Sequence, residues 1–466
     1  MRVSESFVER AARAAYQIVG LLVMPALVLH LLWRSLRQPA YRRHWADRFF
    51  GRGGHSPFSK REAARVLWVH AVSVGETRAA APLILQWLAQ HPRHCVVLTH
   101  TTPTGAETGR QLFEAFLGNS AQHSGQHTEQ QRVVQCTLPY DFSWATARFL
   151  KWAQPSLGVL METELWPNLL AQADRLAIPV ALVNARLSPR SALRLKKWTW
   201  LSGPAVARLT GIAAQTESDL QGFRQVLEQR LSGADHFSPR LEVVGNLKFD
   251  LSTPAEMVQR GMDWRTRLGV TPIWLAASTR DDEERDLLAA WRSQSDRRGI
   301  LLIVPRHPQR FDRVARLIEE AGFACCRRSG FEGNNAIECA PENAVLLGDS
   351  LGEMAAYMAM ADLVLMGGSL LPLGGQNPIE ACAAGKPVFF GPHMFNFAQI
   401  SRALIDSGAG VSVNSYGQWF AEGGRCLASP ERYAAQAQAA RAFAARHRGA
   451  TMRTLTFIET LSPEAS

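Results

Sequence analysis

A glycine-rich segment at Asp362–Pro392 constrains the fold of this chain more than any other stretch. It begins with a short apolar run, Leu363–Met366, which has the length of a buried parallel strand and ends at a pair of glycines. After a glycine-rich loop, Asn377–Glu380 (Asn-Pro-Ile-Glu) has the composition of a helix start, since Asn suits the N-cap, Pro the first helical position and Glu a capping box. The helix is predicted to end at Gly385, and Val388–Phe390 is the next predicted strand.

This order of strand, helix and strand is a βαβ unit. Open α/β sheets bind ligands at the carboxyl ends of their strands, and the N–H groups of a helix start favour a phosphate there. Asn377, Pro378 and Glu380 could serve only to cap the helix. That interpretation does not explain why four glycines crowd the approach to it, namely Gly367, Gly368, Gly374 and Gly375. We therefore predict a phosphate or nucleotide site at this loop.

The composition is that of a globular chain with anionic partners. With 466 residues, 47% of them hydrophobic and 20% charged, the chain is long enough for two domains with separate cores. The formal net charge of +10 points to nucleic acid, phospholipid or a phosphorylated substrate. The seven cysteines include no C-x-x-C pair and no zinc-type spacing, so we expect reduced thiols in the cytosol.

The N-terminal region is predicted to be a membrane anchor. Between Arg13 and Arg34 lie 20 residues without a formal charge, and a helix of ~1.5 Å per residue would just cross a hydrocarbon core of ~30 Å. Gln17, Pro25 and His30 weaken it as a full span, so insertion into one leaflet and a buried core helix stay open as alternatives. A basic flank follows and predicts that the rest of the chain is cytoplasmic: Arg34, Arg37, Arg42, Arg43 and Arg48.

The first sheet begins at Val66–His70, and Ala71–Glu76 leads from this strand into a helix predicted at Thr77–Ala89. Glu76 has two interpretations that the local pattern leaves equally open. It could complement the positive end of the helix dipole, or it could face the ligand edge of the sheet as a general base.

A second pair of carboxylates, Glu162 and Glu164, follows the predicted strand Leu157–Met161 and precedes another helix. The strand and helix alternation from Val66 to Gly245 indicates one doubly wound domain. The polar stretch Gly118–Arg132 is predicted to be a surface loop. The other strands expected in this domain are Val96–Thr99, Val180–Val183 and Gly211–Ala214.

A second set of strands begins at Ile273–Ala276 and continues with Leu301–Val304 and Val345–Leu347. Arg306 follows one of these strands and could bind a phosphate bidentately, although a structural salt bridge is the alternative. No G-x-G-x-x-G follows a strand and no Walker motif occurs, which argues against dinucleotide dehydrogenases and P-loop ATPases. Two facing Rossmann-like domains with a nucleotide site in the second instead favour a GT-B glycosyltransferase.

Several long motifs resemble the Kdo transferase family, which moves 3-deoxy-D-manno-oct-2-ulosonic acid (Kdo) from CMP-Kdo to the lipid A precursor of Gram-negative bacteria. The resemblance covers nearly the whole chain. The motifs are H-A-V-S-V-G-E (His70–Glu76), M-E-T-E-L-W-P-N (Met161–Asn168), N-A-R-L-S (Asn184–Ser188), N-L-K-F-D (Asn246–Asp250), V-P-R-H-P (Val304–Pro308), G-D-S-L-G-E-M (Gly348–Met354), G-G-S-L to N-P-I-E (Gly367–Glu380) and G-P-H-M-F-N-F (Gly391–Phe397).

The resemblance implies an α/β GT-B fold with a membrane anchor at 1–38, an acceptor-binding domain at 39–248 and a donor-binding domain with C-terminal helices at 249–466. It implies an inverting transfer with Glu76 as base, while Glu162 and Lys248 stabilise the transition state. Leu351 replaces a methionine expected at its position. The residues that would hold the CMP group are Pro305, Arg306, Leu351, Gly352, Glu353, Asn377, Pro378, Ile379 and Glu380.

The same resemblance implies that the protein needs no metal or other cofactor and binds no nucleic acid. It places the chain at the cytoplasmic face of the inner membrane, with CMP-Kdo, the lipid A precursor (lipid IVA) and an anionic leaflet as partners. The number of Kdo residues transferred and the oligomeric state stay open.

Two alternatives are weighed against this interpretation. Another GT-B enzyme, such as a UDP-sugar transferase or an epimerase, would share the architecture but is not expected to carry the Met161–Asn168 motif. A basic, membrane-tethered protein that binds lipopolysaccharide or nucleic acid would need no Glu76 and would show salt-dependent binding without turnover.

Overall fold

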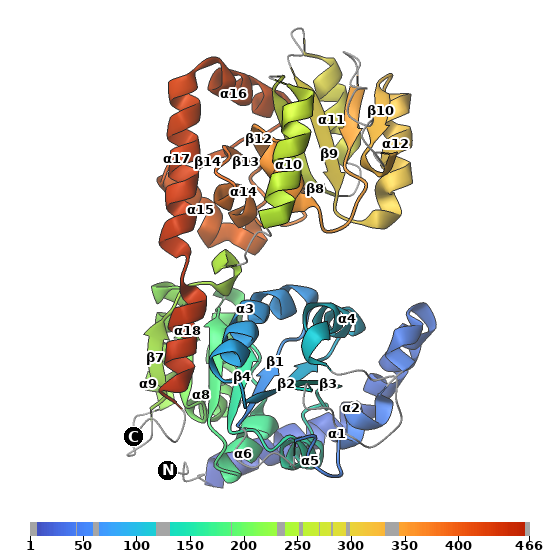
Figure 1. Cartoon of the computed structure of the whole chain (residues 1–466). Coiled ribbons are helices and arrows are strands. Elements are labelled where there is room, and N and C mark those ends of the chain that lie inside the picture. Colours follow the sequence, from blue (N-terminus) through green and yellow to red (C-terminus); the bar gives the residue numbers. More distant parts are fainter. Residues whose placement is uncertain are drawn as a thin grey trace. The chain divides into compact units, whose positions relative to one another are not determined.

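The computed structural model of the chain describes residues 7–42, 44–58, 65–117, 131–187, 189–230, 238–250, 255–269, 271–280, 283–294, 299–330 and 344–461. They form two compact units, each built around its own parallel sheet (Figure 1). Unit 1 comprises Met1–Leu251 and Gly449–Ser466, and unit 2 comprises Ser252–Arg448. Most of the predicted loop Gly118–Arg132 lies outside the described residues.

The sheet of unit 1 has seven parallel strands in the order β3-β2-β1-β4-β5-β6-β7. The chain reverses its direction of travel across the sheet between β1 and β4, and the carboxyl ends of these two strands form the topological switch point where such sheets bind ligands. The strands are β1 (Val66–His70), β2 (Cys95–His100), β3 (Val133–Thr137), β4 (Leu157–Met161), β5 (Val180–Ala185), β6 (Gly211–Ala214) and β7 (Arg240–Val243).

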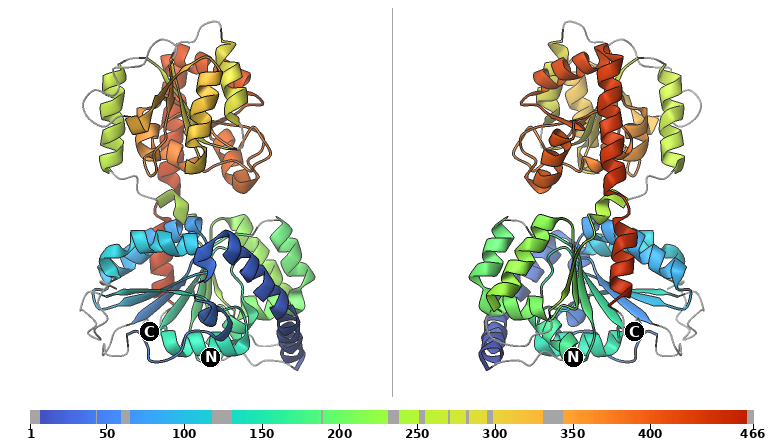
Figure 2. Two further views of the ribbon diagram at one scale, coloured as in Figure 1. Left: turned by 90° about the vertical axis from the view of Figure 1, so that its right-hand side faces the viewer. Right: turned by 90° about the vertical axis from the view of Figure 1, so that its left-hand side faces the viewer.

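Helices cover both faces of this sheet (Figure 2). Leu67 and Val69 of β1 belong to the core under α3 and α18, whereas Val66 and Trp68 belong to the core under α5, α6, α8 and α9. The helices of unit 1 are α1 (Phe7–Arg37), α2 (Trp45–Phe50), α3 (Val74–Gln90), α4 (Pro103–Leu112), α5 (Ser143–Ala153), α6 (Pro167–Arg175), α7 (Pro189–Lys197), α8 (Thr199–Ala207), α9 (Glu217–Arg230) and α18 (Ala450–Glu459), with the 3₁₀ turns η1 (Pro39–Arg42), η2 (Glu114–Phe116) and η3 (Leu247–Asp250).

The last helix corrects the expected domain division. Residues 249–466 were expected to form the second domain, but α18 packs on unit 1 against α3, η3 and β6. Leu455, Phe457 and Ile458 of α18 are buried in the core of the first sheet. The Asp250 carboxylate accepts a hydrogen bond from the Gly449 amide (2.6 Å), so η3 also holds the start of this helix.

Unit 2 has a second sheet of seven parallel strands in the order β10-β11-β9-β8-β12-β13-β14. The strands are β8 (Ile273–Thr279), β9 (Ile300–Pro305), β10 (Ala324–Arg327), β11 (Ala344–Leu347), β12 (Leu363–Met366), β13 (Val388–Phe390) and β14 (Gly410–Ser412). The helices are α10 (Ala255–Leu268), α11 (Glu283–Arg292), α12 (Phe311–Glu320), α13 (Met354–Met360), α14 (Ile379–Ala383), α15 (Ala398–Asp406), α16 (Tyr416–Ala428) and α17 (Pro430–His447), with η4 (Pro308–Arg310), η5 (Arg328–Gly330) and η6 (Phe395–Phe397).

The ten strands predicted from the sequence are all present, and the two predicted parallel-sheet domains are confirmed. The strands that the sequence did not predict are β3, β7, β10 and β14, which are the outer strands of the two sheets. In unit 1, α1 is long and apolar enough to cross a membrane by length and composition alone.

Candidate active site

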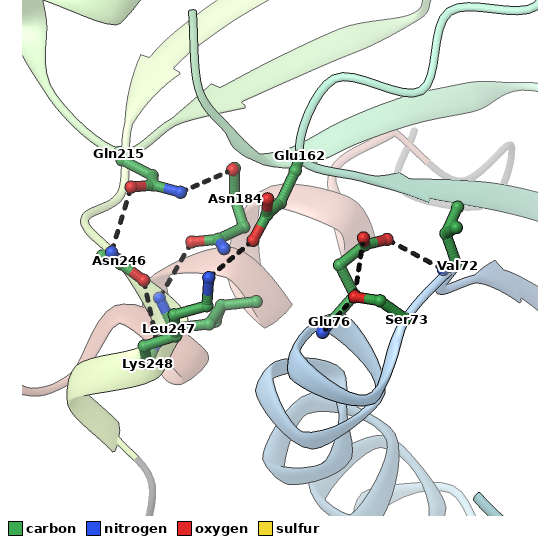
Figure 3. A network of polar contacts seen from close by, with 9 residues as sticks. All are labelled: Val72, Ser73, Glu76, Glu162, Asn184, Gln215, Asn246, Leu247 and Lys248. Carbon is green, nitrogen blue, oxygen red and sulfur yellow. Dashed lines mark hydrogen bonds and ion pairs between the residues drawn. The ribbon is translucent and has the colours of Figure 1, made fainter. Parts of the chain in front are cut away.

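Glu76 lies in the first turn of α3, directly after the carboxyl end of β1 (Figure 3). Ser73 caps this helix, and its hydroxyl donates to Glu76 Oε1 (3.0 Å). The amide of Val72 donates to Glu76 Oε2 (2.8 Å). The carboxylate therefore contributes to the helix cap, as the structural interpretation predicted, and these two bonds also fix its position at the ligand edge of the sheet.

The environment of Glu76 suits a group that exchanges protons near neutral pH. Its pKa is raised from 4.5 to about 7, mainly by burial and in part by the negative charges of Glu162 and Glu164, although the bonds from Val72 and Ser73 act to lower it. A carboxyl with this pKa is deprotonated in a substantial fraction of molecules at pH 7 and is still basic enough to accept a proton. The geometry supports both interpretations of Glu76, and they do not exclude one another.

Glu162 and Lys248 form an ion pair beside Glu76 (Figure 3). Glu162 follows β4, and Lys248 Nζ lies 2.8 Å from Glu162 Oε1. The Lys248 side chain is 25% exposed and the Glu162 side chain 22%. Glu162 has a φ of 57°, in the left-handed region that non-glycine residues rarely occupy. Such a conformation persists only where the surroundings hold it, and it is concentrated at functional sites. The structure thus brings the three predicted catalytic residues together in unit 1.

The predicted donor residues of unit 2 follow three strands of the second sheet. Pro305 ends β9, and Arg306 after it is exposed. Leu351 is 72% exposed and lies with Gly352 and Glu353 in a pocket of about 470 Å³ that follows β11. Because all the strands are parallel, these residues and those after β12 share one edge of the sheet.

Glu353 is only 8% exposed and is held by positive charge. Its Oε1 accepts hydrogen bonds from Arg260 (2.8 Å) and Arg328 (3.0 Å), and the Ser350 hydroxyl donates to Oε2 (2.5 Å). These bonds lower the pKa of Glu353 against the opposing effect of burial. The carboxylate is therefore ionised and fixed where it lines the pocket.

The helix after the glycine-rich loop differs from the prediction. It begins at Ile379 with Pro378 as N-cap, so Asn377 is not the N-cap, although its Oδ1 accepts a hydrogen bond from the Ile379 amide (3.2 Å). The helix has five residues, too few for a strong dipole. Pro378 and Ile379 are buried, whereas Glu380 is exposed.

Backbone conformation explains the glycines of this loop. Gly374 and Gly375 have φ values of 93° and 74°, and a Cβ at either position would meet Asn396 or Met394 at little more than 2 Å. A side chain would therefore push the loop away from the segment that packs against it, and only glycine fits these two positions.

Comparison with known proteins identifies the family. The sequence model described as 3-deoxy-D-manno-octulosonic-acid transferase (kdotransferase) matches residues 43–251. The Bordetella pertussis 3-deoxy-D-manno-octulosonic acid transferase is 40% identical over 455 residues, which are 96% of this chain and 99% of that protein. The chain belongs to the Kdo transferase family. The Haemophilus influenzae transferase of the same name is 35% identical over 409 residues, 86% of this chain and 87% of that protein.

Among solved structures, UDP-GlcNAc 2-epimerase from Neisseria meningitidis matches with a TM-score of 0.53 and 15% identity over 85% of this chain and 99% of that chain. This likeness concerns the fold alone and confirms the GT-B class of two parallel-sheet α/β domains. The Kdo transferase is therefore a glycosyltransferase, and the alternative of a non-enzymatic binding protein is wrong.

Sequence reasoning missed a set of amide side chains that holds Lys248 in place (Figure 3). Asn184, which is fully buried, accepts a hydrogen bond from the Leu247 amide (3.0 Å). Gln215 donates to the Asn184 carbonyl (2.9 Å) and accepts from Asn246 (3.0 Å), whose Oδ1 accepts from the Lys248 amide (2.9 Å). Asn184 and Gln215 directly follow strands predicted from the sequence, and that position was the signal available.

In unit 2 the Kdo transferase has a second feature that the sequence did not reveal. Glu283 is 2% exposed and accepts hydrogen bonds from the amides of Gly368 (2.7 Å) and Arg280 (2.9 Å), so one carboxylate joins the ends of β12 and β8. The adjacent Glu284 forms a buried ion pair with Arg310 (2.7 Å). Within the described residues, no group of three or more His, Cys, Asp or Glu side chains is placed to hold a metal ion.

Proposed function

We propose that this Kdo transferase moves Kdo from CMP-Kdo to the lipid A precursor (lipid IVA), with inversion and with Glu76 as the general base. The observation that carries the proposal is the half-buried Glu76 carboxylate, whose pKa is raised to about 7, beside the ion pair of Glu162 and Lys248. A base with a pKa near the working pH accepts a proton most effectively.

The proposed reaction is a single displacement. The hydroxyl oxygen of the acceptor attacks the anomeric carbon of Kdo while its proton passes to Glu76. The bond from the anomeric carbon to the CMP phosphate breaks, and its electron pair leaves with the phosphate oxygen. Lys248, fixed by Glu162 and by the amide network, supplies positive charge for the transition state. Attack opposite the leaving group inverts the anomeric configuration.

We assign acceptor binding to unit 1 and donor binding to unit 2. The assignment follows the motifs, since the base is in unit 1 and the family's CMP residues are in unit 2. Arg306 is exposed after β9, where its guanidinium could pair with the donor phosphate. The buried Pro305, Pro378 and Ile379 would contribute through their main chain, and the exposed Glu380 through its carboxylate.

We also propose that α1 attaches the protein to the cytoplasmic face of the inner membrane by lying along it. Positions that are at least half-buried recur every three or four residues along α1 from Glu9 to Ser35, so one side packs on unit 1. Gln17 of the helix hydrogen-bonds to α5 and α6, which a side chain surrounded by lipid could not do. Its outer side is apolar and exposed, with Val8, Ile18, Leu22, Leu29, Trp33 and Leu36.

The decisive test incubates the full chain with CMP-Kdo and a tetra-acylated lipid A precursor and determines the mass of the product. We expect the acceptor mass to increase by one or more Kdo residues, with release of CMP. Transfer from a UDP-sugar but not from CMP-Kdo would contradict the donor assignment, and hydrolysis of CMP-Kdo without an acceptor product would contradict the acceptor assignment.

A further inference from the structure

Two adjacent polar residues interrupt the apolar part of α1 and face unit 1. Gln17 Oε1 accepts hydrogen bonds from the Ser143 amide (3.2 Å) and from Asn168 Nδ2 (2.9 Å). The Tyr16 hydroxyl lies close enough to the Asp141 carboxylate to lower its pKa. A helix that served only as a lipid anchor would have no use for hydrogen bonds within its apolar stretch, so these contacts need another explanation.

The residues that α1 contacts are those that build the start of α6. Trp166, the N-cap of α6, makes no side-chain cap. Asp141 supplies the cap instead, because its two carboxylate oxygens accept from the amides of Asn168 (3.0 Å) and Leu169 (2.8 Å). The Asn168 side chain, 1% exposed, also donates to the Asp141 carbonyl (2.6 Å).

This arrangement leaves the cap dependent on α1. The pKa of Asp141 is raised to about 6, because the effect of burial outweighs the two α6 amides and the Tyr16 hydroxyl, which act to lower it. The hydroxyl of α1 thus helps to keep charged the carboxylate that caps α6, and a charged carboxylate is the stronger acceptor at a helix start.

A second contact of α1 reaches the other end of α6. The Arg208 side chain is 4% exposed and lies 3.8 Å from Glu9 of α1 and 3.9 Å from Asp174 of α6. Helix α6 is therefore fixed to α1 near both of its ends.

The start of α6 follows directly on the turn that carries Glu162. Four residues separate Glu162, with its left-handed φ of 57°, from the first residue of α6. Within this turn the Trp166 indole donates to Glu164 (2.7 Å), and Glu162 pairs with Lys248 (2.8 Å). Because the left-handed conformation is held by its surroundings, a shift at the start of α6 passes directly to the Glu162 carboxylate.

We propose that Tyr16 and Gln17 are positioning residues for the transfer reaction, which act through Asp141 and Asn168 to hold the turn that carries Glu162. Helix α1 then has two sides with two roles: the outer side faces lipid, and the inner side supports the active site. The effect on turnover rests on the function proposed above, whereas the effect on the turn does not.

The test uses the full chain with Gln17→Met, which keeps the length of the side chain without its acceptor, and Tyr16→Phe, which removes one hydroxyl. The acceptor is dispersed in detergent, so that membrane partition does not limit the rate. Since misplacement of ~1 Å can cost ~10²-fold in rate, we expect kcat to fall about tenfold or more in Gln17→Met, with the KM for the donor within about threefold of wild type. Gln221→Met is the matched control, because Gln221 donates to Glu217 on the exposed side of α9, and we expect it to leave kcat unchanged.

Amide hydrogen exchange over residues 162–169 supplies a readout that is independent of turnover. We expect faster exchange there in both α1 variants than in wild type and Gln221→Met, with exchange in the second sheet unchanged. Wild-type exchange over 162–169 together with wild-type kcat would overturn the proposal. If Gln17→Met fails to fold, Tyr16→Phe alone decides. If wild type itself transfers no Kdo, the proposed function has failed, and the exchange data still test the positioning role.

Discussion

Replacing Glu76 by glutamine separates the two roles that the structure gives this side chain. The glutamine carbonyl can accept from the Val72 amide, and its amide group can donate to the Ser73 hydroxyl, which now accepts. The contacts of the helix cap are thus preserved. The variant lacks only the basic oxygen that would take the proton from the acceptor hydroxyl.

The magnitudes expected for the two roles lie far apart. Loss of a general base costs ~10²–10⁴-fold in rate, which is ~3–5 kcal/mol of activation free energy. The interaction of a charge with the helix dipole is worth only ~0.3–1 kcal/mol, so a carboxylate that served the helix alone could be replaced with turnover nearly normal.

The raised pKa of Glu76 adds a signature in stability. The folded-state pKa, about 7, is above the ordinary value of 4.5, so the stabilisation from the protonated form is complete below pH 4.5 and is lost as the pH rises through 7. The full difference corresponds to about 3 kcal/mol. Glutamine never acquires the charge, so Glu76→Gln should melt at a higher temperature than wild type at pH 8.5, and the advantage should shrink at pH 5.

The assay is single-turnover transfer between pH 5.5 and 8.5, with a CMP titration and a thermal melt for each variant. The wild-type rate should rise with pH through about 7 and then level off, because Glu76 must be deprotonated to act as base. The variant should be slow at every pH and bind CMP normally. A Glu76→Gln rate within about threefold of wild type would refute the base assignment, and Glu162 or Glu164 would become the next candidate.

Three further predictions concern the rest of the protein. Lys248→Met should lower kcat by roughly ten- to a hundredfold, because a charge-assisted bond is worth ~1.5–3 kcal/mol. Lys248→Arg should retain more activity than Lys248→Met. Equal rates in Lys248→Met and wild type would show that the lysine has no role in the mechanism. Arg306→Ala should weaken CMP binding in calorimetry by the same factor, and unchanged affinity would place Arg306 outside the donor site. Leu22 is 75% exposed on the outer side of α1, and Leu22→Ser should reduce co-sedimentation with anionic vesicles without altering far-UV circular dichroism. Undiminished vesicle binding would argue against this face as the anchor.

The central strands were predictable from the sequence because they are buried on both faces. The predicted bounds of β1, β4, β6, β12 and β13 agree with the structure residue for residue. The sequence of a strand covered by helices on both sides is an unbroken apolar run, and such a run can be recognised in the sequence without knowledge of the fold. The outer strands are covered less and read as ordinary polar segments: most of β7 and β10 is at least partly exposed.

The candidate site was predictable as a set of residues but not as a chemical environment. Glu76, Glu162 and Lys248 lie in motifs that the sequence displays openly, and each follows a strand. The raised pKa of Glu76 depends on burial and on the charge of Glu162, 86 residues along the chain, and the pairing of Glu162 with Lys248 closes a similar distance. A local pattern carries no information on charges that approach one another only in the folded chain.

The placement of the two terminal helices was decided by tertiary structure alone. Their amphipathic patterns show that α1 and α18 bury one face, but a pattern does not specify which core receives it. Asp250 of η3 holds the start of α18, and Asp141 and Asn168 contact α1. These contacts join segments more than a hundred residues apart, and they place both helices on unit 1. The apolar character of α1 could be predicted from the sequence. Its support of the active-site turn exists only where the folded domain brings two polar side chains of α1 against the buried start of α6.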